Sequence, residues 1–203
     1  MLRSPRSLLP LFFVLSGWVG APLATAANFD GVAEVANVRF DRVRPDWYQV
    51  DVELDVKAAS GNTSRYVNRV SVGLSLAFKL TGSDERFEYY RASATAVTVK
   101  HGRTNFRFYL PPEVVERDRL SGAADYWTVD LKVGDNAMPR SAKQVSSSLP
   151  NPGVLESFLG RINAEARAND GVLVPQYQSP FAWSQSGQGG PSFVREPEET
   201  ARP

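Results

Sequence analysis

The chain has 203 residues, with 23 basic and 22 acidic side chains, one histidine and no cysteine. The lack of cysteine excludes disulfides, thiolate nucleophiles and cysteine-ligated metal centres, and a single histidine excludes histidine-rich metal sites. The balanced charge argues against general nucleic-acid binding, which needs a basic face. These counts favour a soluble globular protein of one domain.

Residues 1–26 predict a secretory signal peptide. Arg3 and Arg6 precede an apolar run over residues 8–19, and a small-residue cleavage motif ends at Ala26. The run is too short to span a bilayer comfortably. Cleavage would leave 177 residues with a formal net charge of −1. We therefore expect an exported bacterial protein, periplasmic or at the cell surface, with no membrane span after cleavage.

Alternation of apolar and polar residues predicts most of the remaining structure. It is clearest over residues 48–57, where every even position is apolar and the odd positions are mostly charged. A strand places those charges on one face, whereas a helix would scatter them. Six or seven strands are predicted in all, near residues 35–43, 48–57, 70–80, 87–99, 106–110, 126–133 and 172–174. Their short spacing predicts an antiparallel β-sandwich or barrel.

The segment 87–99 is rich in β-forming residues, but its pattern drifts from Phe87 and Tyr89 through small residues to Val97 and Val99. A β-bulge near residues 92–96 is predicted, because one extra residue re-aims the side chains that follow it.

Two helical segments interrupt the strands. Pro111-Pro112 predicts the start of a short helix. The stronger signal covers residues about 151–169, with Asn151 as N-cap, Pro152 in the first turn and an apolar stripe beyond them. Residues 184–203 lack apolar periodicity and are predicted to be a disordered tail. The predicted organisation is thus one β-sandwich domain over residues 27–183 with an ancillary helix near the C-terminus.

No catalytic motif is evident. His101, beside Gly102, is expected at an exposed hairpin tip. Asp51, Glu53 and Asp55 form one straight row, which does not supply the converging oxygens that calcium needs. A solvated strand face, paired with basic side chains across the sheet, is the expected role of this row. We therefore expect no enzymatic activity and no metal or other cofactor.

Aromatic residues are the candidate contact surface, namely Trp47, Tyr89, Tyr90 and Tyr109. In a sandwich such rings usually fill the core or stack across strands. Exposed on one flat face, they would instead form a carbohydrate-binding platform. Burial is the default expectation for aromatic side chains.

Three segments carry a resemblance to a known family: residues 42–48 (RVRPDWY), 108–118 (FYLPPEVVERD) and 168–177 (ANDGVLVPQY). Together they resemble exported bacterial pilus-like proteins with an immunoglobulin-like β-sandwich, associated with type IV pilus-type systems. The chain departs from a type IV prepilin, which keeps its long apolar N-terminal helix. The resemblance therefore implies an accessory protein and carries over no binding residue.

These observations lead to one main functional hypothesis and two alternatives. The main hypothesis is a non-enzymatic surface or periplasmic interaction module of a pilus-like or secretion-type assembly, with envelope or pilus-type protein partners. An exposed strand edge, the loops or the helical end would contact the partner. The alternatives are a carbohydrate-binding module of the envelope and an envelope hydrolase. Nucleic acid is not expected as a partner.

Overall fold

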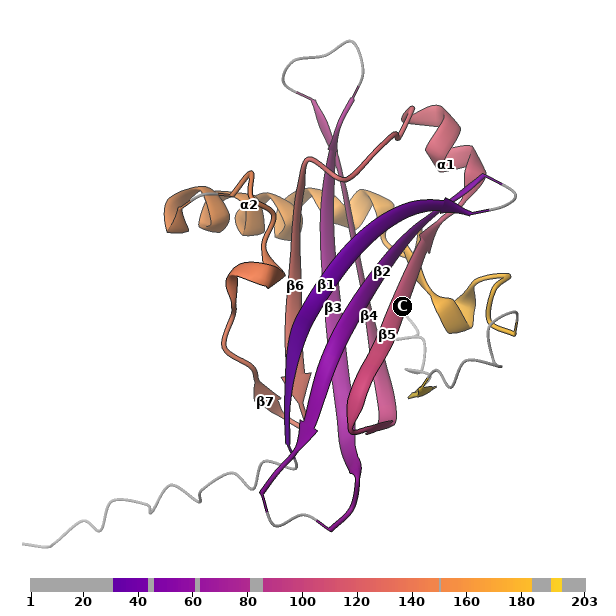
Figure 1. Ribbon diagram of the computed structural model, residues 1–203. Coiled ribbons are helices and arrows are strands. Elements are labelled where there is room, and N and C mark those ends of the chain that lie inside the picture. The colour runs from indigo at the N-terminus through magenta and orange to yellow at the C-terminus, as the bar shows by residue number, and fades with distance from the viewer. Residues whose placement is uncertain are drawn as a thin grey trace, which may run out of the picture.

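The computed structural model describes residues 31–43, 46–60, 63–80, 86–149, 151–183 and 191–194. The predicted signal peptide lies outside these residues. The described chain forms two antiparallel sheets that pack face to face, with helices around them (Figure 1). A mainly β, antiparallel sandwich is therefore confirmed.

Each sheet is built on long strands, and short strands lie at three of the four sheet edges. The four-stranded sheet has the order β1 (Gly31–Val43), β2 (Trp47–Ala58), β5 (Gly102–Leu110) and β8 (Val174–Pro175). The five-stranded sheet has the order β7 (Asn136–Ala137), β6 (Tyr126–Val133), β3 (Tyr66–Lys79), β4 (Phe87–Lys100) and β9 (Ser192–Val194). The second strand pairs with the fifth and the third with the sixth, as in immunoglobulin-like sandwiches.

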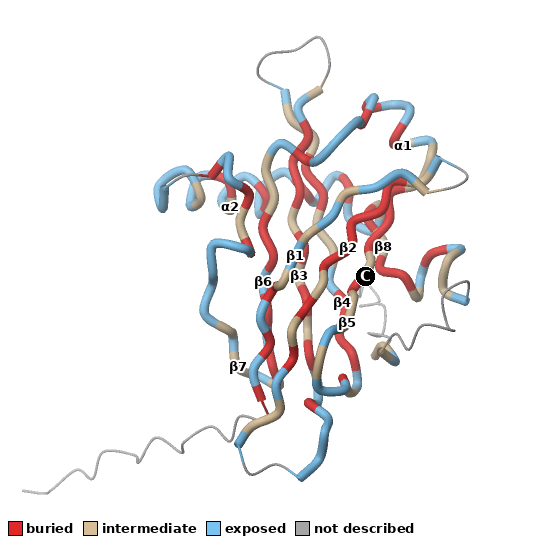
Figure 2. Tube along the Cα trace, in the orientation of Figure 1, coloured by how far each residue is buried: buried red, intermediate tan, exposed pale blue. Residues whose placement is uncertain are grey.

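The alternation in β2 works as the sequence predicts. Its even positions from Tyr48 to Val56 are all buried in the core between the sheets (Figure 2). On the outer face, Asp51 pairs with Arg39 of β1 at 3.2 Å and with Arg107 of β5 at 3.4 Å. The expected cross-strand pairing is thus present. Asp51 itself is not solvated, however, because it is only 4% exposed.

The sequence predicts a bulge in β4 near residues 92–96, and β4 shows an irregularity just beyond that segment, where its register with β9 shifts between Ala96 and Thr98. Pairing with β3 runs in constant register through residues 92–96. Phe87 and Tyr89 instead face outward, where a helix covers them, while Ala94 and Ala96 face the core. The change of face comes later, between Ala96 and Val99, opposite Arg69 of β3, whose φ is +50°. The drift therefore has two causes: the first part of the strand is covered on both faces, and an irregularity follows just beyond the predicted segment.

The two helices begin where the sequence predicts. The first, α1 (Pro112–Arg117), lies at one end of the sandwich, and the second, α2 (Pro152–Glu165), continues into a 3₁₀ turn, η2 (Ala166–Asn169). Helix α2 crosses the outer face of the five-stranded sheet and forms a second, smaller core with it (Figure 1). Two further 3₁₀ turns are η1 (Ala142–Gln144) and η3 (Gln176–Gln178). No helix within the described ranges is long and apolar enough to cross a membrane.

The predicted disordered tail needs one correction. Its residues Ser192–Val194 form strand β9, which pairs with the outer edge of β4. Phe193 makes this possible because its ring packs against the core. The rest of the tail, apart from Pro191, lies outside the described residues.

Candidate functional site

A hollow lies beside helix α2, on the outer face of the five-stranded sheet, and we call it the α2 groove. It consists of two adjoining open pockets, of about 210 and about 470 Å³, which share Phe87, Tyr89 and Arg161. The smaller pocket is completed by Tyr126, Leu149, Val154, Ser157 and Phe158, and the larger by Arg86, Glu88, Ala164, Glu165 and Ala168. The groove thus combines an aromatic part with a charged part.

Local sequence features hold α2 in place above the sheet. The side chain of Asn151 accepts a hydrogen bond of 3.0 Å from the backbone N–H of Val154, which caps the helix. Pro152 occupies the first turn, where its missing N–H costs nothing. Phe158 and Ile162, four residues apart and so on one face, are buried against the sheet. This burial fixes the distance between the helix and the sheet, and thereby the position of the helix beside the groove.

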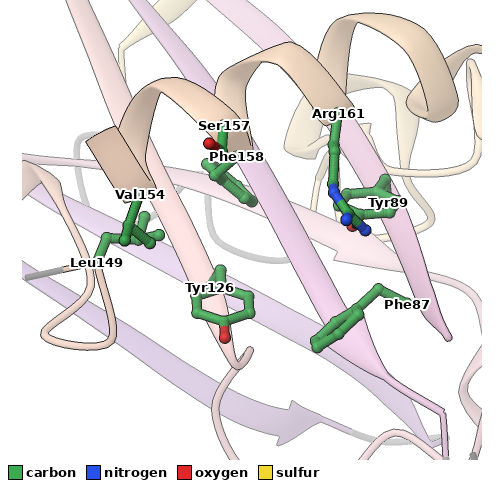
Figure 3. A pocket seen from close by; sticks show the side chains of 8 residues that line it. All are labelled: Phe87, Tyr89, Tyr126, Leu149, Val154, Ser157, Phe158 and Arg161. Atoms are coloured by element: carbon green, nitrogen blue, oxygen red, sulfur yellow. Dashed lines mark hydrogen bonds between the residues drawn. The ribbon is translucent and has the colours of Figure 1, made fainter. Parts of the chain in front are cut away.

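The aromatic part is built from rings on three different elements. The ring centroids of Phe87 on β4 and Tyr126 on β6 are 5.5 Å apart, and those of Tyr126 and Phe158 on α2 are 6.2 Å apart. Arg161 extends from α2 to the hydroxyl of Tyr89, to which it donates a hydrogen bond of 3.4 Å (Figure 3). Such a surface suits an apolar group that carries a negative charge, because the rings bury the first and the guanidinium attracts the second.

Tyr90, a predicted contact residue, is fully buried in the core. Its hydroxyl donates to Asp118, and Arg117 donates to the same carboxylate at 2.7 and 2.8 Å. Burial raises the pKa of the Tyr90 hydroxyl, and the bond to Asp118 adds to this. Burial also tends to raise the pKa of Asp118, but the hydrogen bonds from Arg117 and Tyr90 outweigh it and lower that pKa. The three groups join α1 to the sandwich and are structural.

Tyr109 and Trp47 lie on the outer face of the four-stranded sheet. Tyr109 is fully buried beneath Phe181, with the two rings stacked at 4.8 Å, and Trp47 meets Phe181 edge-on at 5.7 Å. Burial raises the pKa of Tyr109 to about 12. Its hydroxyl has no hydrogen-bond partner among the described residues. The segment after η3 thus covers this aromatic pair.

The structure therefore does not assemble the four predicted residues into one surface. Tyr90 lies between the sheets, Tyr109 and Trp47 lie under Phe181, and Tyr89 alone reaches the α2 groove. Their rings do not form a flat exposed platform, because Tyr89, Tyr90 and Tyr109 are each at most 5% exposed. This removes the basis on which these residues suggested carbohydrate binding.

The sequence pattern does not identify most of the groove, namely the contact residues Phe87, Tyr126, Phe158 and Arg161. One signal was available, because Phe158 and Arg161 are three residues apart and so neighbours on one side of the predicted helix. The place of that helix on the sheet, and hence the aromatic part of the groove, depends on tertiary packing.

His101 lies at the exposed tip of the β4–β5 hairpin, as predicted, and its backbone N–H donates to the carbonyl of Arg65 at 2.7 Å. Across the described part of the chain, no group of three or more histidine, cysteine, aspartate and glutamate side chains is placed to hold a metal ion.

Comparison with known proteins supports the fold alone. No family model matches the chain, and no curated protein matches it. Among solved structures, the chain is similar to a crystal structure of a protein from Akkermansia muciniphila, with a TM-score of 0.57 and 14% sequence identity. The similarity covers 84% of this chain and 96% of that one. At this identity it shows a shared architecture that includes nearly the whole of the other chain.

Proposed function

We propose that this protein is a non-enzymatic interaction module of the bacterial envelope, which binds a protein segment in the α2 groove. The partner would belong to a pilus-like or secretion-type assembly. The segment would present an apolar side chain beside a carboxylate. The aromatic rings would bind the apolar side chain, and Arg161 would bind the carboxylate. The observation that carries this proposal is the open aromatic groove next to an exposed arginine.

The architecture supports a binding role. A sandwich with a continuous buried core is a rigid scaffold, and the groove is built on two of its strands and a capped helix. Sites on such elements hold their geometry better than sites on loops. The predicted signal peptide and the resemblance to exported pilus-like proteins support the envelope as its location.

The experiment places a photo-crosslinking residue at Val154, a side chain of the groove that is 39% exposed. The control places it at Lys132, which is exposed on β6, six residues or about 20 Å from Tyr126. In envelope extracts, a specific adduct is expected from position 154 alone. Its mass-spectrometric identification would then show whether the partner belongs to a pilus-like or secretion-type assembly.

Charge variants make this test specific. Arg161→Glu should abolish the adduct, because it reverses the charge in the groove, whereas Arg167→Glu, on an exposed residue of the following turn, should preserve it. Equal adducts from positions 154 and 132, or adducts that survive Arg161→Glu, would contradict the proposal.

A further inference from the structure

Strand β9 occupies a slot on the open side of the sandwich, and we call this the β4 slot. Its residues pair antiparallel with the outer edge of β4, with Val194 opposite Thr95 and Phe193 opposite Ala96. The Phe193 ring meets Phe106 of β5 edge-on at 5.5 Å. It also stacks on Tyr177 of η3 at 5.4 Å. One aromatic side chain thus bridges both sheets and the segment that follows α2.

The slot exists because the inner face of β4 carries small side chains. Ala92, Ala94 and Ala96 point into the core, where larger residues would otherwise fill the space at this edge. Phe193 supplies that missing volume. Without β9, the strand edge and the adjacent Phe106 ring would lose this cover, and an exposed apolar edge is a template for pairing with another strand. The slot therefore needs an occupant that brings both a strand and an aromatic ring.

Its present occupant is held by few contacts. β9 has three residues, of which Ser192 is exposed while Phe193 and Val194 are half-buried. A pocket of about 340 Å³ opens beside Pro191 and Ser192, so the start of the strand is loosely packed. Short edge strands with little buried area open at low free-energy cost. Phe193 is consequently the main anchor.

We propose that the β4 slot accepts strand β9 from a second copy of this chain. Every copy carries the segment that fits the slot, so exchange breaks and remakes the same contacts. Residues 184–190 (SQSGQGG) contain no apolar side chain and allow a reach of roughly 25 Å from Trp183 to Pro191. Such a contact is heterologous, so it closes into a ring or extends along a filament.

The balance between the two arrangements follows from concentration. A short linker gives the chain's own strand an effective concentration in the millimolar range. Dilute protein is therefore expected to be monomeric, and exchange becomes substantial where copies are crowded together. The β4 slot is separate from the α2 groove, because the slot lies at the edge of β4 that pairs with β9, whereas the groove lies on the outer face of the sheet.

The absence of cysteine makes a direct test possible. Thr95→Cys and Val194→Cys are introduced into separate preparations of different mass, which are mixed up to millimolar concentration and oxidised. Exchange places the two thiols opposite each other. The yield of mixed disulfide should therefore be at least tenfold higher than in a control mixture of Thr95→Cys with Lys132→Cys. Adding Phe193→Ser to the Val194→Cys chain should remove this excess. A yield equal to the Lys132→Cys control would overturn the proposal.

A second measurement avoids any change to β4. A fluorescent peptide of residues 189–197 (GGPSFVREP) is titrated into the full chain carrying Phe193→Ser, whose own strand has lost its anchor. Binding is expected to be at least tenfold tighter than to the unmodified chain, where the native strand competes. The same peptide with serine in place of phenylalanine should not bind. Absence of saturable binding, or equal binding of both peptides, would refute strand acceptance in trans.

Discussion

Removing the Asp118 carboxylate tests how α1 is joined to the sandwich. Asp118 is 6% exposed and accepts hydrogen bonds from Tyr90 and from two nitrogens of Arg117. In Asp118→Ala the buried Tyr90 hydroxyl loses its acceptor, which costs about 1–3 kcal/mol. Arg117 adds little, because its side chain is 56% exposed and water replaces its partner. We therefore expect the free energy of unfolding to fall by about 2 kcal/mol.

The dependence of the free energy of unfolding on acidic pH gives an independent check. The pKa of Asp118 is lower in the folded chain than in the unfolded chain, where it is about 3.9. Its contribution is therefore fully present above pH about 4–5 and is lost as the pH falls through the folded value. Asp118→Asn removes this titration, so the difference in stability between the two proteins should shrink as the pH is lowered from 6 towards 3.

The assay is equilibrium urea unfolding followed by tryptophan fluorescence, with Trp127 packed against the core as a native reporter. Tyr90→Phe supplies the matched variant, because it removes the hydroxyl and leaves the carboxylate bonded to Arg117. It should cost about 1 kcal/mol, and the double variant should cost less than the two single variants added together. A loss below 0.5 kcal/mol for Asp118→Ala, or a pH-independent difference for Asp118→Asn, would refute this reasoning.

Three further predictions concern other parts of the chain. Phe158→Ala should lower the free energy of unfolding by about 3 kcal/mol, because it empties the contact between α2 and the sheet; thermal unfolding would show it, and the exposed Glu156→Ala should change little. Asn151→Ala should cost about 1 kcal/mol in the same assay, since it removes the cap on the N–H of Val154. His101→Ala should leave partner binding in the α2 groove and stability unchanged. A hydrolytic activity that is present in the unmodified chain and absent from this variant would contradict a non-enzymatic role.

The parts of the fold that were predictable are those in which one residue pattern has one structural solution. Alternation in β2 leaves its charged residues only one outward face. Asn151 and Pro152 mark the start of α2 by local chemistry alone. In both cases the signal lies within about one turn or a few residues of chain, so tertiary packing has little to add.

Strand β4 shows the opposite case. Both faces of β4 are covered, one by the other sheet and one by α2, so its apolar residues do not alternate. At the level of sequence, a bulge near residues 92–96 explained the same residue pattern equally well, whereas the register shift lies just after it, between Ala96 and Thr98. The distinction needs the position of α2, which is more than fifty residues further along the chain. The α2 groove was unpredictable for the same reason, since Phe87 and Phe158 line one pocket only after that packing.

The segments after β6 explain how a chain without disulfides closes its sandwich. α2 covers the outer face of the five-stranded sheet, the Phe181 segment covers Tyr109 on the other sheet, and Phe193 fills the side between β4 and β5. The first two are continuous with η2 and η3 and are anchored by buried residues. Only the third follows the linker 184–190 and rests on a single ring. Of these three segments, β9 is therefore the one whose removal disturbs the sandwich least. This makes β9 the segment suited to exchange between copies.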